Sequence, residues 1–430
     1  MAEENLIRGI DRWSLVAIVI NSIIGAGIFR LPSDVTALVG SYSLAAFLVC
    51  TLMIGLIMLC HAEVSSRFSS TGGPYLYARE AFGPVIAFEI GWLSVLVRTT
   101  SYAAILNIFV TYCGFFLPYA TEPVIRIGIV GGVVSTLAIV NIIGVRQTAM
   151  MTNLITFGKL AALFAFVVIG LFYLQSENFN FYDLPERSSF SKAVLILVFA
   201  FFGFEMALIP AGEVRDPKKA FPFALLFALV AVSVVYFLVQ LVSIGTLPSL
   251  AISQRPLAEA ASNFMGPYGA ALIAAAALIS ILGNLNVGLL AGSRLIFAMG
   301  ERQEIPLIFS RTNTRFRTPI AAIVFTALMI FIFTIQFSFL TVLLTATVAR
   351  LVVYATTCLS LIAFRRRDDV PRARFSIPFG DATAILSLLL IGWLITNVDF
   401  NKEGIPIIVA ALIGLVFFFL NRLSRTRYAS

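Results

Sequence analysis

The sequence has few charged residues. Asp, Glu, Lys and Arg make up 12% of its 430 residues, about half of the 25% that is usual in soluble globular proteins. The mean hydropathy is +0.97, and apolar runs of about 20 residues, long enough to cross a bilayer, recur along the chain. Membrane β-strands would instead give short segments of alternating polarity. The sequence therefore predicts an all-α integral membrane protein with several spanning helices.

Residues that bind metals or perform catalysis are also scarce. The chain has one histidine, His61, and four cysteines, Cys50, Cys60, Cys113 and Cys358, at no metal-ligand spacing. Because the cysteines lie in or beside apolar runs, they are expected to be small buried hydrophobic residues. The sequence contains neither a Walker A glycine loop nor a credible nucleophile–base pair. It therefore predicts no enzyme, no cofactor, no metal site and no direct use of ATP.

The basic residues indicate orientation rather than a nucleic-acid partner. The net charge is +8, but the cations lie in short loops between apolar runs and not on one face. Basic loops follow the even-numbered runs, as in "SSRFSS", "GVRQ", "EVRDPKK", "RTNTRFRTP" and "FRRRDDVPRAR", and "NRLSRTR" lies near the C-terminus. Loops after odd-numbered runs, such as "VGSYS" and "LPYATEP", hold few cations. The positive-inside rule therefore predicts both termini in the cytoplasm, with the chain in the cytoplasmic (inner) membrane.

Twelve spanning segments are predicted from the apolar runs. Their expected ranges are 12–39, 41–67, 83–117, 124–143, 151–174, 190–212, 221–247, 267–299, 319–335, 338–364, 382–398 and 404–422.

Two of these spans are interrupted by glycine at mid-depth. Span 1 reads "NSIIGAGIFR", with Gly25 and Gly27, and span 6 reads "VFAFFGFEMALIPAGEV", with Gly203 followed by Glu205. Glycine inside a helix destabilises it by about 1 kcal/mol relative to alanine. Interrupted segments at corresponding places of two halves indicate a transporter built from inverted repeats with broken helices. The alternative is that these glycines only allow close helix packing.

The spacing of the two interruptions sets the domain organisation. Spans 1 and 6 are five apart, and because five is odd, the second half enters the bilayer from the opposite side. We therefore expect a first inverted repeat of five spans at residues 1–175 and a second at 189–365. The last two spans and a cytoplasmic C-terminus follow at 366–430.

An unwound segment in span 1 has a specific chemical use. It frees backbone N–H groups at Gly25–Gly27, at the start of the second half-helix, where they and the helix dipole attract an anion. The carbonyl groups around Ile23, at the end of the first half-helix, can accept hydrogen bonds from an ammonium group. Both groups together suit a zwitterion. Unpaired backbone in hydrocarbon costs several kcal/mol, so such a break is expected only where it lines a cavity.

Four blocks of sequence resemble one known family, in the order in which the family carries them. They are "IIGAGIF", "SSRFSSTGGPYLYAREAFGPVIAFEIGW", "FAFFGFE" with "GEVRDPKKAFP", and "LAGSRLIFAM". The chain thereby resembles the amino acid–polyamine–organocation (APC) superfamily over nearly its whole length. This resemblance implies the leucine-transporter (LeuT) type of fold, a 5+5 inverted repeat in which helices 1 and 6 are broken. It also implies amino acid transport, often without sodium.

The resemblance assigns expected substrate-binding residues where single positions match. In spans 1 and 6 it implies backbone contacts to the charged ends of the substrate, a gating aromatic residue and the second break. In span 3 it implies three pocket-facing residues, and in span 8 two residues near the substrate side chain. In chain order these positions are Ile23, Gly25, Ala26, Gly27, Ser94, Val95, Thr99, Phe199, Phe202, Gly203, Asn286 and Val287.

Ionisable residues at membrane depth are candidates for function. Lys159 matches a span-5 lysine that some family members place where sodium-dependent relatives bind sodium, which implies a coupling or structural role. The alternative is a lysine that extends to the inner surface. Glu205 is expected to brace the unwound backbone of span 6. Arg98 and Arg350 are possible structural or gating charges, with Glu205 or Glu89 as candidate partners.

His61 lies near the cytoplasmic end of span 2. We expect it to be solvated there. The alternative is a histidine that relays protons.

The sequence thus predicts a secondary transporter that moves a neutral L-amino acid by alternating access without sodium. The expected pocket contains no acid to balance a cationic side chain. Coupling to protons and exchange both stay open, so the expected partners are the amino acid, membrane lipid and, for symport, a proton. Alternatives are a membrane sensor or channel on the same fold, or an antiporter of amines and amino acids. The preferred amino acid, the direction of flux and the oligomeric state are not assigned.

Overall fold

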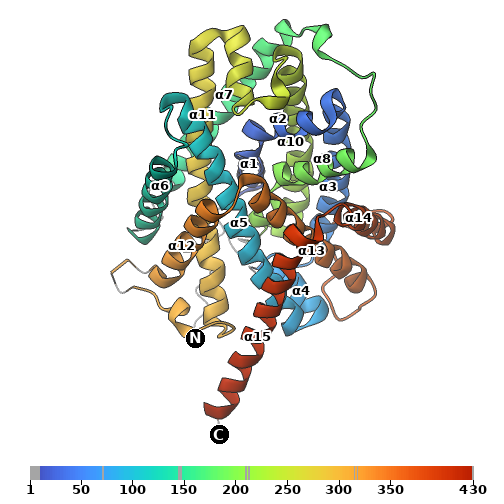
Figure 1. Cartoon of the computed structure of the whole chain (residues 1–430). Coiled ribbons are helices and arrows are strands. Elements are labelled where there is room, and N and C mark those ends of the chain that lie inside the picture. The colour runs from blue at the N-terminus through green and yellow to red at the C-terminus, as the bar shows by residue number, and fades with distance from the viewer. Residues whose placement is uncertain are drawn as a thin grey trace.

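Helices form the structure throughout its described parts. The computed structural model describes residues 10–69, 72–143, 148–208, 211, 214–313, 315–316 and 318–428. Within these ranges the only β pairing is an isolated bridge between Ile10 and Val214. The all-α prediction is therefore confirmed for the described residues (Figure 1).

The helices have the following bounds, with short 3-10 or π turns marked η. They are α1 (Arg12–Ile23), α2 (Gly27–Val39), η1 (Gly40–Tyr42), α3 (Ser43–Ser65), α4 (Pro74–Phe82), α5 (Pro84–Phe116), α6 (Pro123–Ile143), α7 (Thr148–Gly170), η2 (Leu171–Tyr173), η3 (Ser176–Asn178), α8 (Arg187–Val198), η4 (Phe199–Phe201), α9 (Phe204–Ala207), α10 (Pro217–Thr246), η6 (Leu250–Ile252), α11 (Pro256–Glu301), η7 (Leu307–Ser310), α12 (Ile320–Gln336), α13 (Phe339–Arg365), α14 (Gly380–Ile395), η8 (Phe400–Gly404) and α15 (Ile405–Tyr428).

Eight helical segments of the described chain are long and apolar enough to cross a membrane, and four shorter apolar helices accompany them. The long segments include α5, α6, α10, α11 and α13, while α1, α12 and α14 are among the shorter ones. Each of the twelve expected ranges overlaps at least one helix. Twelve spans arranged as two inverted repeats nevertheless stay a prediction.

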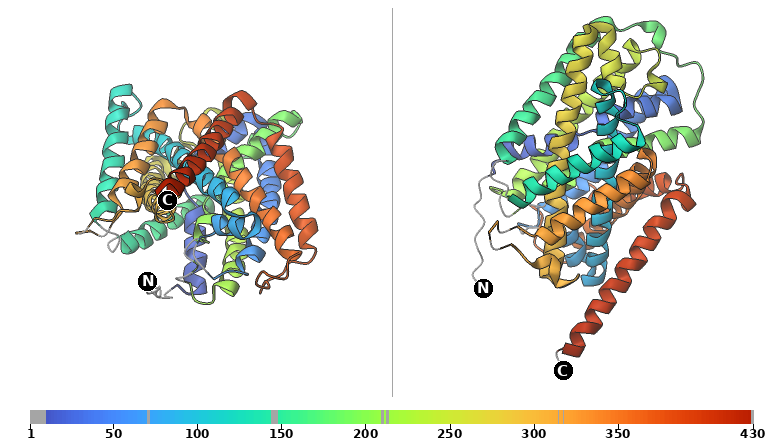
Figure 2. Two further views of the ribbon diagram at one scale, coloured as in Figure 1. Left: turned by 90° about the horizontal axis from the view of Figure 1, so that it is seen from below. Right: turned by 60° about the vertical axis from the view of Figure 1, so that its left-hand side comes forward.

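The chain bends back and forth between two ends. We call the end that holds α4 and the connection from α11 to α12 the lower end, and the end that holds the connections from α7 to α8 and from α10 to α11 the upper end (Figure 1). The C-terminal end of α15 lies at the lower end and stands clear of the other helices (Figure 2).

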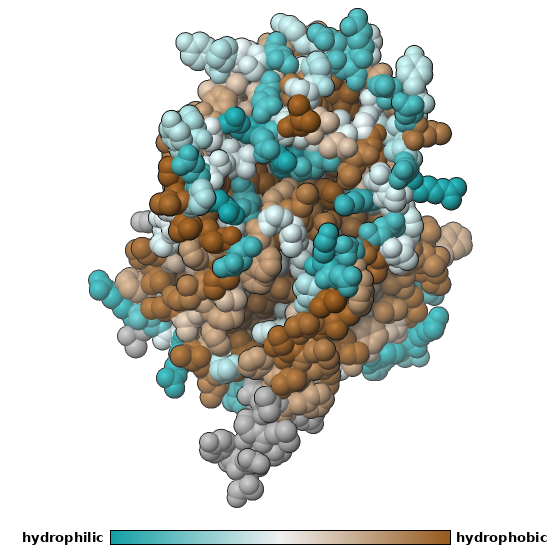
Figure 3. All heavy atoms as spheres, in the orientation of Figure 1, coloured by the Kyte–Doolittle hydropathy of each residue, from teal (hydrophilic) through white to brown (hydrophobic). Residues whose placement is uncertain are grey.

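Helix α5 is the central element. It packs against α4, α11, α12, α13 and α15, and most of its residues are buried. The outer helices instead expose apolar side chains, among them Ile127 on α6, Leu328 on α12 and Leu412 on α15. Figure 3 shows apolar side chains gathered over the lower half of one face. A surface of this kind suits contact with lipid.

The first expected interruption is a sharp turn between α1 and α2. Ile24 has φ −72° and ψ 85°, and the Gly25 N–H donates to the Ile23 carbonyl at 2.8 Å. These values describe an inverse γ-turn. Helix α2 begins again at Gly27.

The second expected interruption separates α8 from α9. The helix tightens at η4, Phe202 adopts an extended ψ of 140°, and Gly203 has φ 116°. This positive φ favours glycine, which has no Cβ. Only four residues, α9, continue the helix beyond the break.

Two elements differ from the sequence-based expectation. The basic segment after span 2, expected to be a loop, contains the helix α4, which begins with Pro74 in the first turn where its missing N–H is no loss. Span 8 was expected to begin at 267, but α11 begins at Pro256 and passes through a kink at Gly266, with φ 67°. Pro267 lacks the N–H that would continue the helix without a kink.

Candidate functional site

The two interruptions lie against each other. A Cβ on Gly203 would collide with the backbone carbonyl of Ser22, at the end of α1. A Cβ on Gly27, at the start of α2, would lie 3.4 Å from the Ala200 Cα and 3.6 Å from the Phe199 ring. The absence of side chains at these two glycines therefore allows the broken segments to pack backbone to backbone.

Two side chains from other helices bind the carbonyl end of α1. The Lys159 ammonium group, on α7, donates to the carbonyl oxygens of Asn21 at 3.1 Å and Ile24 at 2.6 Å. The Tyr236 hydroxyl, on α10, lies 2.9 Å from the carbonyl oxygens of both Ile23 and Ala200. It has one proton and can donate to only one of them at a time. Lys159 is 2% exposed, so within the fold it is a buried cation and does not extend to the surface.

Free backbone donors remain at the start of α2. The first N–H groups of a helix have no partner within it, and at α2 these belong to Gly27 and its neighbours. The Gly25 N–H, which the sequence had assigned to the same anion site, is occupied by the Ile23 carbonyl. The set of free N–H groups at the start of α2 is therefore smaller than expected. Gly27, where this set begins, lies beside Phe199 and Ala200.

The α5 residues divide between two environments. Ser94, Arg98 and Tyr102 lie four residues apart and share one face: Arg98 contacts Met206 of α9, and the Tyr102 ring meets Phe202 edge-on at 5.9 Å. Val95 instead packs with Ile296 and Met299 of α11.

Thr99 donates to the carbonyl groups of Val95 and Leu96 in its own helix. Of the three expected α5 residues, Ser94 is the one that lines a small cavity together with Arg98.

Of the two expected residues of α11, Asn286 points toward α6. Asn286 accepts a hydrogen bond from Asn141 of α6 at 2.8 Å, and it therefore faces α6. Asn284 lies beside the first break, because a Cβ on Gly25 would be 2.5 Å from its Nδ2.

Helix periodicity explains which asparagine meets the break. Asn284 and Gly288, four residues apart, lie on one face of α11, and the Tyr102 ring fills the space in front of Gly288. Val287 is partly buried. The spacing of Asn284 and Gly288 puts the two residues on one face, but only their contacts in the fold show that this face meets the break.

Arg350 and Glu205 form the pair that the sequence could not assign. Arg350, on α13 and 1% exposed, places its Nε 3.4 Å from Glu205 Oε1 and donates to the Ser101 hydroxyl at 2.7 Å. Its guanidinium carbon lies 4.0 Å from the Phe202 ring centre and 5.9 Å from that of Phe199, close enough for cation–π attraction.

The other carboxylate oxygen of Glu205 accepts from the Gly203 N–H at 3.2 Å and from the Tyr354 hydroxyl at 3.0 Å. Glu205 thus holds the unwound backbone. The other candidate partner, Glu89, has no hydrogen-bond partner for either carboxylate oxygen among the described residues.

The expectation that His61 is solvated is wrong. Its side chain is completely buried, and its ring lies edge-on to Phe204 at 5.2 Å and Tyr354 at 5.4 Å. Its Nδ1 lies 2.9 Å from the Ile57 carbonyl, which requires the proton on that nitrogen. The sequence position misled because α3 passes through the bundle between α8, α10 and α13, so its lower part is covered by protein.

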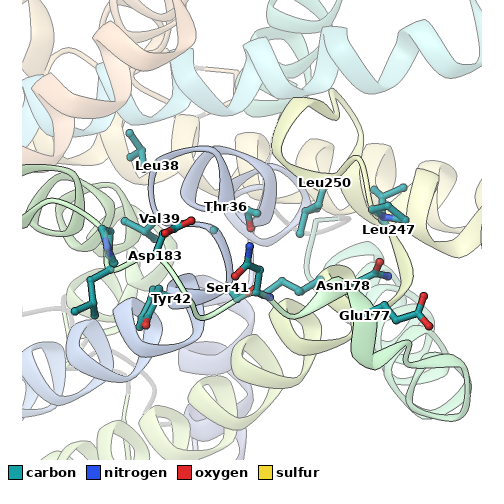
Figure 4. A pocket seen from close by; sticks show the side chains of 16 residues that line it. Thr36, Leu38, Val39, Ser41, Tyr42, Glu177, Asn178, Asp183, Leu247 and Leu250 are labelled. Carbon is teal, nitrogen blue, oxygen red and sulfur yellow. The ribbon is translucent and has the colours of Figure 1, made fainter.

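Two cavities flank this region. A small one of about 40 Å³ lies on the lower side of the second break, lined by Ser94, Arg98, Glu205, Met206 and Arg350 with residues of α4, α11 and α13. A larger one of about 510 Å³ lies at the upper end, between the end of α2, η1, the segment 177–185 and the end of α10 (Figure 4). The larger cavity contains none of the expected site residues.

Tyr236 is a residue that the sequence analysis missed, and it supplies a test of how the breaks are held. Replacement by phenylalanine removes the only donor that joins Ile23 to Ala200 while keeping the ring between Phe47 and Phe201. The Ala200 carbonyl then loses the Tyr236 donor, whereas the Ile23 carbonyl keeps the Gly25 N–H, and a buried carbonyl group left unpaired costs about 1–3 kcal/mol. We expect Tyr236→Phe to lower the thermal midpoint of the purified protein.

The matched control is Tyr268→Phe, because the Tyr268 side chain is 92% exposed and its hydroxyl has no such role. If both variants melt at the wild-type temperature, the Tyr236 hydroxyl does not hold the breaks together.

Comparison with known proteins gives one family. The family described as amino acid permease matches residues 10–418. The chain is 29% identical to the serine/threonine exchanger SteT of Bacillus subtilis (strain 168) over 324 residues, which cover 72% of each chain. It is 28% identical to the human cystine/glutamate transporter over 323 residues, covering 72% of this chain and 64% of that protein.

A third relative aligns over more of the chain. The methylthioribose transporter of Bacillus subtilis (strain 168) is 24% identical over 434 residues, covering 97% of this chain and 94% of that protein. The match over residues 10–418 confirms the resemblance that the sequence motifs carried. The chain therefore belongs to the amino acid permease family of the APC superfamily, a family of integral membrane transporters.

Proposed function

We propose that the chain is a secondary transporter that carries a neutral L-amino acid across the cytoplasmic membrane by alternating access, without sodium. The observation that carries this proposal is the contact between the two broken helices. Free N–H groups at the start of α2 lie close to the end of α1. The carbonyl oxygens of Asn21 and Ile24 there already accept from Lys159, and each has a second lone pair, so a carboxylate and an ammonium group can bind side by side. In a LeuT-type arrangement of two inverted repeats, such a site lies near the middle of the membrane.

The proposal also includes the orientation of the protein in the membrane and the position of the substrate. Both termini lie in the cytoplasm, which makes the lower end of the molecule the cytoplasmic end. Phe199 and Phe202 cover the site from the α8 side, with their rings stacked at 6.3 Å. The substrate side chain points toward Tyr102 and Asn284, which replaces the earlier assignment to Asn286 and Val287. Exchange is one mode of coupling, supported by the similarity to SteT, and proton symport is the other.

A thermal-shift screen of purified protein tests the substrate class. A ligand at about 100 times its dissociation constant stabilises the native state by about 2.7 kcal/mol if it binds only that state. We expect small neutral amino acids such as serine to raise the midpoint more than arginine, lysine or glutamate. Serine methyl ester and ethanolamine should have no effect, because they lack the carboxylate.

Gly27→Val should lose the response to serine. A Cβ there already touches Ala200, and the further methyl groups of valine would occupy the space beside the N–H groups. Gly132→Val is the control, since nothing lies within 4 Å of that position on α6. If ethanolamine stabilises the protein as much as serine does, the proposed carboxylate site is wrong. Stabilisation by methylthioribose alone would overturn the amino acid assignment.

Uptake into proteoliposomes separates a carrier from the other classes. Saturable uptake with counterflow is expected. Flux that does not saturate would indicate a channel, and binding without flux would indicate a sensor.

A further inference from the structure

Arg98 is a buried cation with little to bind. Arg98 lies on α5, one turn below Tyr102, and is 6% exposed. The one hydrogen bond it makes within the described residues goes to the Met206 sulfur at 3.2 Å. A thioether sulfur is a weak acceptor, and the Arg98 Nε has no described partner at all. A buried charge is ordinarily paired and hydrogen-bonded, and within the described residues this guanidinium group has no such counterpart.

The neighbouring charges do not supply that counterpart. Glu205 is the one carboxylate among the residues that line the small cavity. One of its oxygens faces Arg350 and the other accepts from Gly203 and Tyr354. Arg350 adds a second cation at the same cavity, and its own Nε and Nη1 lack hydrogen-bond partners within the described chain. Among the described residues that line this cavity, two guanidinium groups face one carboxylate, which leaves one positive charge unbalanced.

The cavity beside Arg98 has a defined size. Its volume of about 40 Å³ is room for roughly three water-sized groups, since one water needs about 10–15 Å³ by this measure. A chloride ion or a single carboxylate group has this size, whereas a complete amino acid does not. Tyr75 and Pro74 of α4 line the same cavity, so it extends from the second break toward the lower end of the molecule.

We propose that Arg98, with Arg350 beside it, binds a small monovalent anion in this cavity. The anion is either chloride or the side-chain carboxylate of the transported amino acid. The chloride form is independent of the proposed function. The carboxylate form rests on it, since the substrate must then extend from the breaks into the cavity, and it would change the preferred side chain from neutral to acidic.

The test is anion-dependent stability of the purified protein in nanodiscs. The starting buffer contains the sodium salt of 2-(N-morpholino)ethanesulfonate, a bulky anion that has no carboxylate, and chloride or glutamate replaces it at constant ionic strength. We expect one of the two anions to raise the thermal midpoint of wild type in a saturable manner. Arg98→Gln should weaken the apparent affinity at least about tenfold, and Arg98→Lys, which keeps the charge, should weaken it less.

Arg367→Gln is the matched control. Arg367 is a surface arginine at the lower end, paired with Asp369 at 2.6 Å, and its removal changes the net charge by the same amount. This variant should respond as wild type does. Equilibrium binding of radioactive chloride to wild type keeps the test valid if the Arg98 variants do not fold.

The outcomes separate the two sources of the anion. A chloride response that depends on Arg98 assigns an inorganic anion and leaves the neutral amino acid proposal intact. A glutamate response that depends on Arg98, without a chloride response, assigns the substrate carboxylate and corrects only the preferred side chain. If neither anion stabilises wild type and no chloride binds, or if Arg98→Gln responds as wild type does, the cavity holds water and the proposal is wrong.

Discussion

Replacement of Gly203 by alanine is expected to reduce amino acid uptake into proteoliposomes at least about 100-fold, which corresponds to about 2.8 kcal/mol. Gly203 has φ 116°, a conformation that disfavours any residue with a Cβ. The added Cβ would also collide with the Ser22 carbonyl at the end of α1. The backbone of the second break must then move away from the first, and the Gly203 N–H loses its bond to Glu205.

The control for this variant is Gly132→Ala. Gly132 lies in α6 with nothing within 4 Å of its Cβ position, and alanine favours a helix over glycine. Gly132→Ala should therefore transport as wild type does. Wild-type uptake by Gly203→Ala would show that the contact between the two breaks is not needed for transport.

Lys159→Ala is expected to reduce uptake to background. Its ammonium group joins the carbonyl oxygens of Asn21 and Ile24, at the end of the first half-helix. Without it, two carbonyl groups at membrane depth lose their donor, which costs several kcal/mol each when no water replaces it. We propose that the lysine takes the place of a bound cation, so wild-type uptake should be unchanged when choline replaces sodium.

The control is Lys192→Ala, an exposed lysine on α8. It should transport normally. The proposal for Lys159 is wrong if wild-type uptake requires sodium or if Lys159→Ala transports at the wild-type rate. A pH gradient applied to both proteins separates the two coupling modes. A response that wild type shows and Lys159→Ala lacks would favour proton symport, and no response in wild type would favour exchange.

The site shows what the sequence pattern along each helix can and cannot predict. Gly25, Gly27 and Gly203 stood out in the sequence because glycine is unfavourable inside a helix, and the chain does interrupt its helices there. From the sequence, Asn286 of α11, and not Asn284, was assigned to the substrate side chain. Asn284 meets the first break and Asn286 meets α6, because the two positions point to different sides of one helix and the sequence does not say which helix covers each side.

The buried charged residues also show which features the sequence predicts and which depend on packing between helices. Their depth in apolar runs marked Lys159, Glu205, Arg98 and Arg350 as functional candidates. Their partners came from helices far away in sequence: Arg350 of α13 reaches Glu205 of α9, and the one described hydrogen bond of Arg98 goes to the Met206 sulfur of α9.

His61 was misjudged for a related reason. Hydropathy measures depth along one helix, whereas burial of His61 depends on Phe204 and Tyr354 of two other helices.

By itself, the sequence determined that this chain is an all-α membrane protein of the amino acid permease family, with interruptions at two named glycine positions. These properties depend on local composition: apolar length favours the bilayer, and glycine weakens the helix at a point. Only the tertiary structure decided that Tyr236 joins the two breaks, that Lys159 binds the end of α1, and that Arg98 lies beside a small cavity. Hydrogen bonds and unbalanced charges arise between helices, and they depend on packing distances that no single segment encodes.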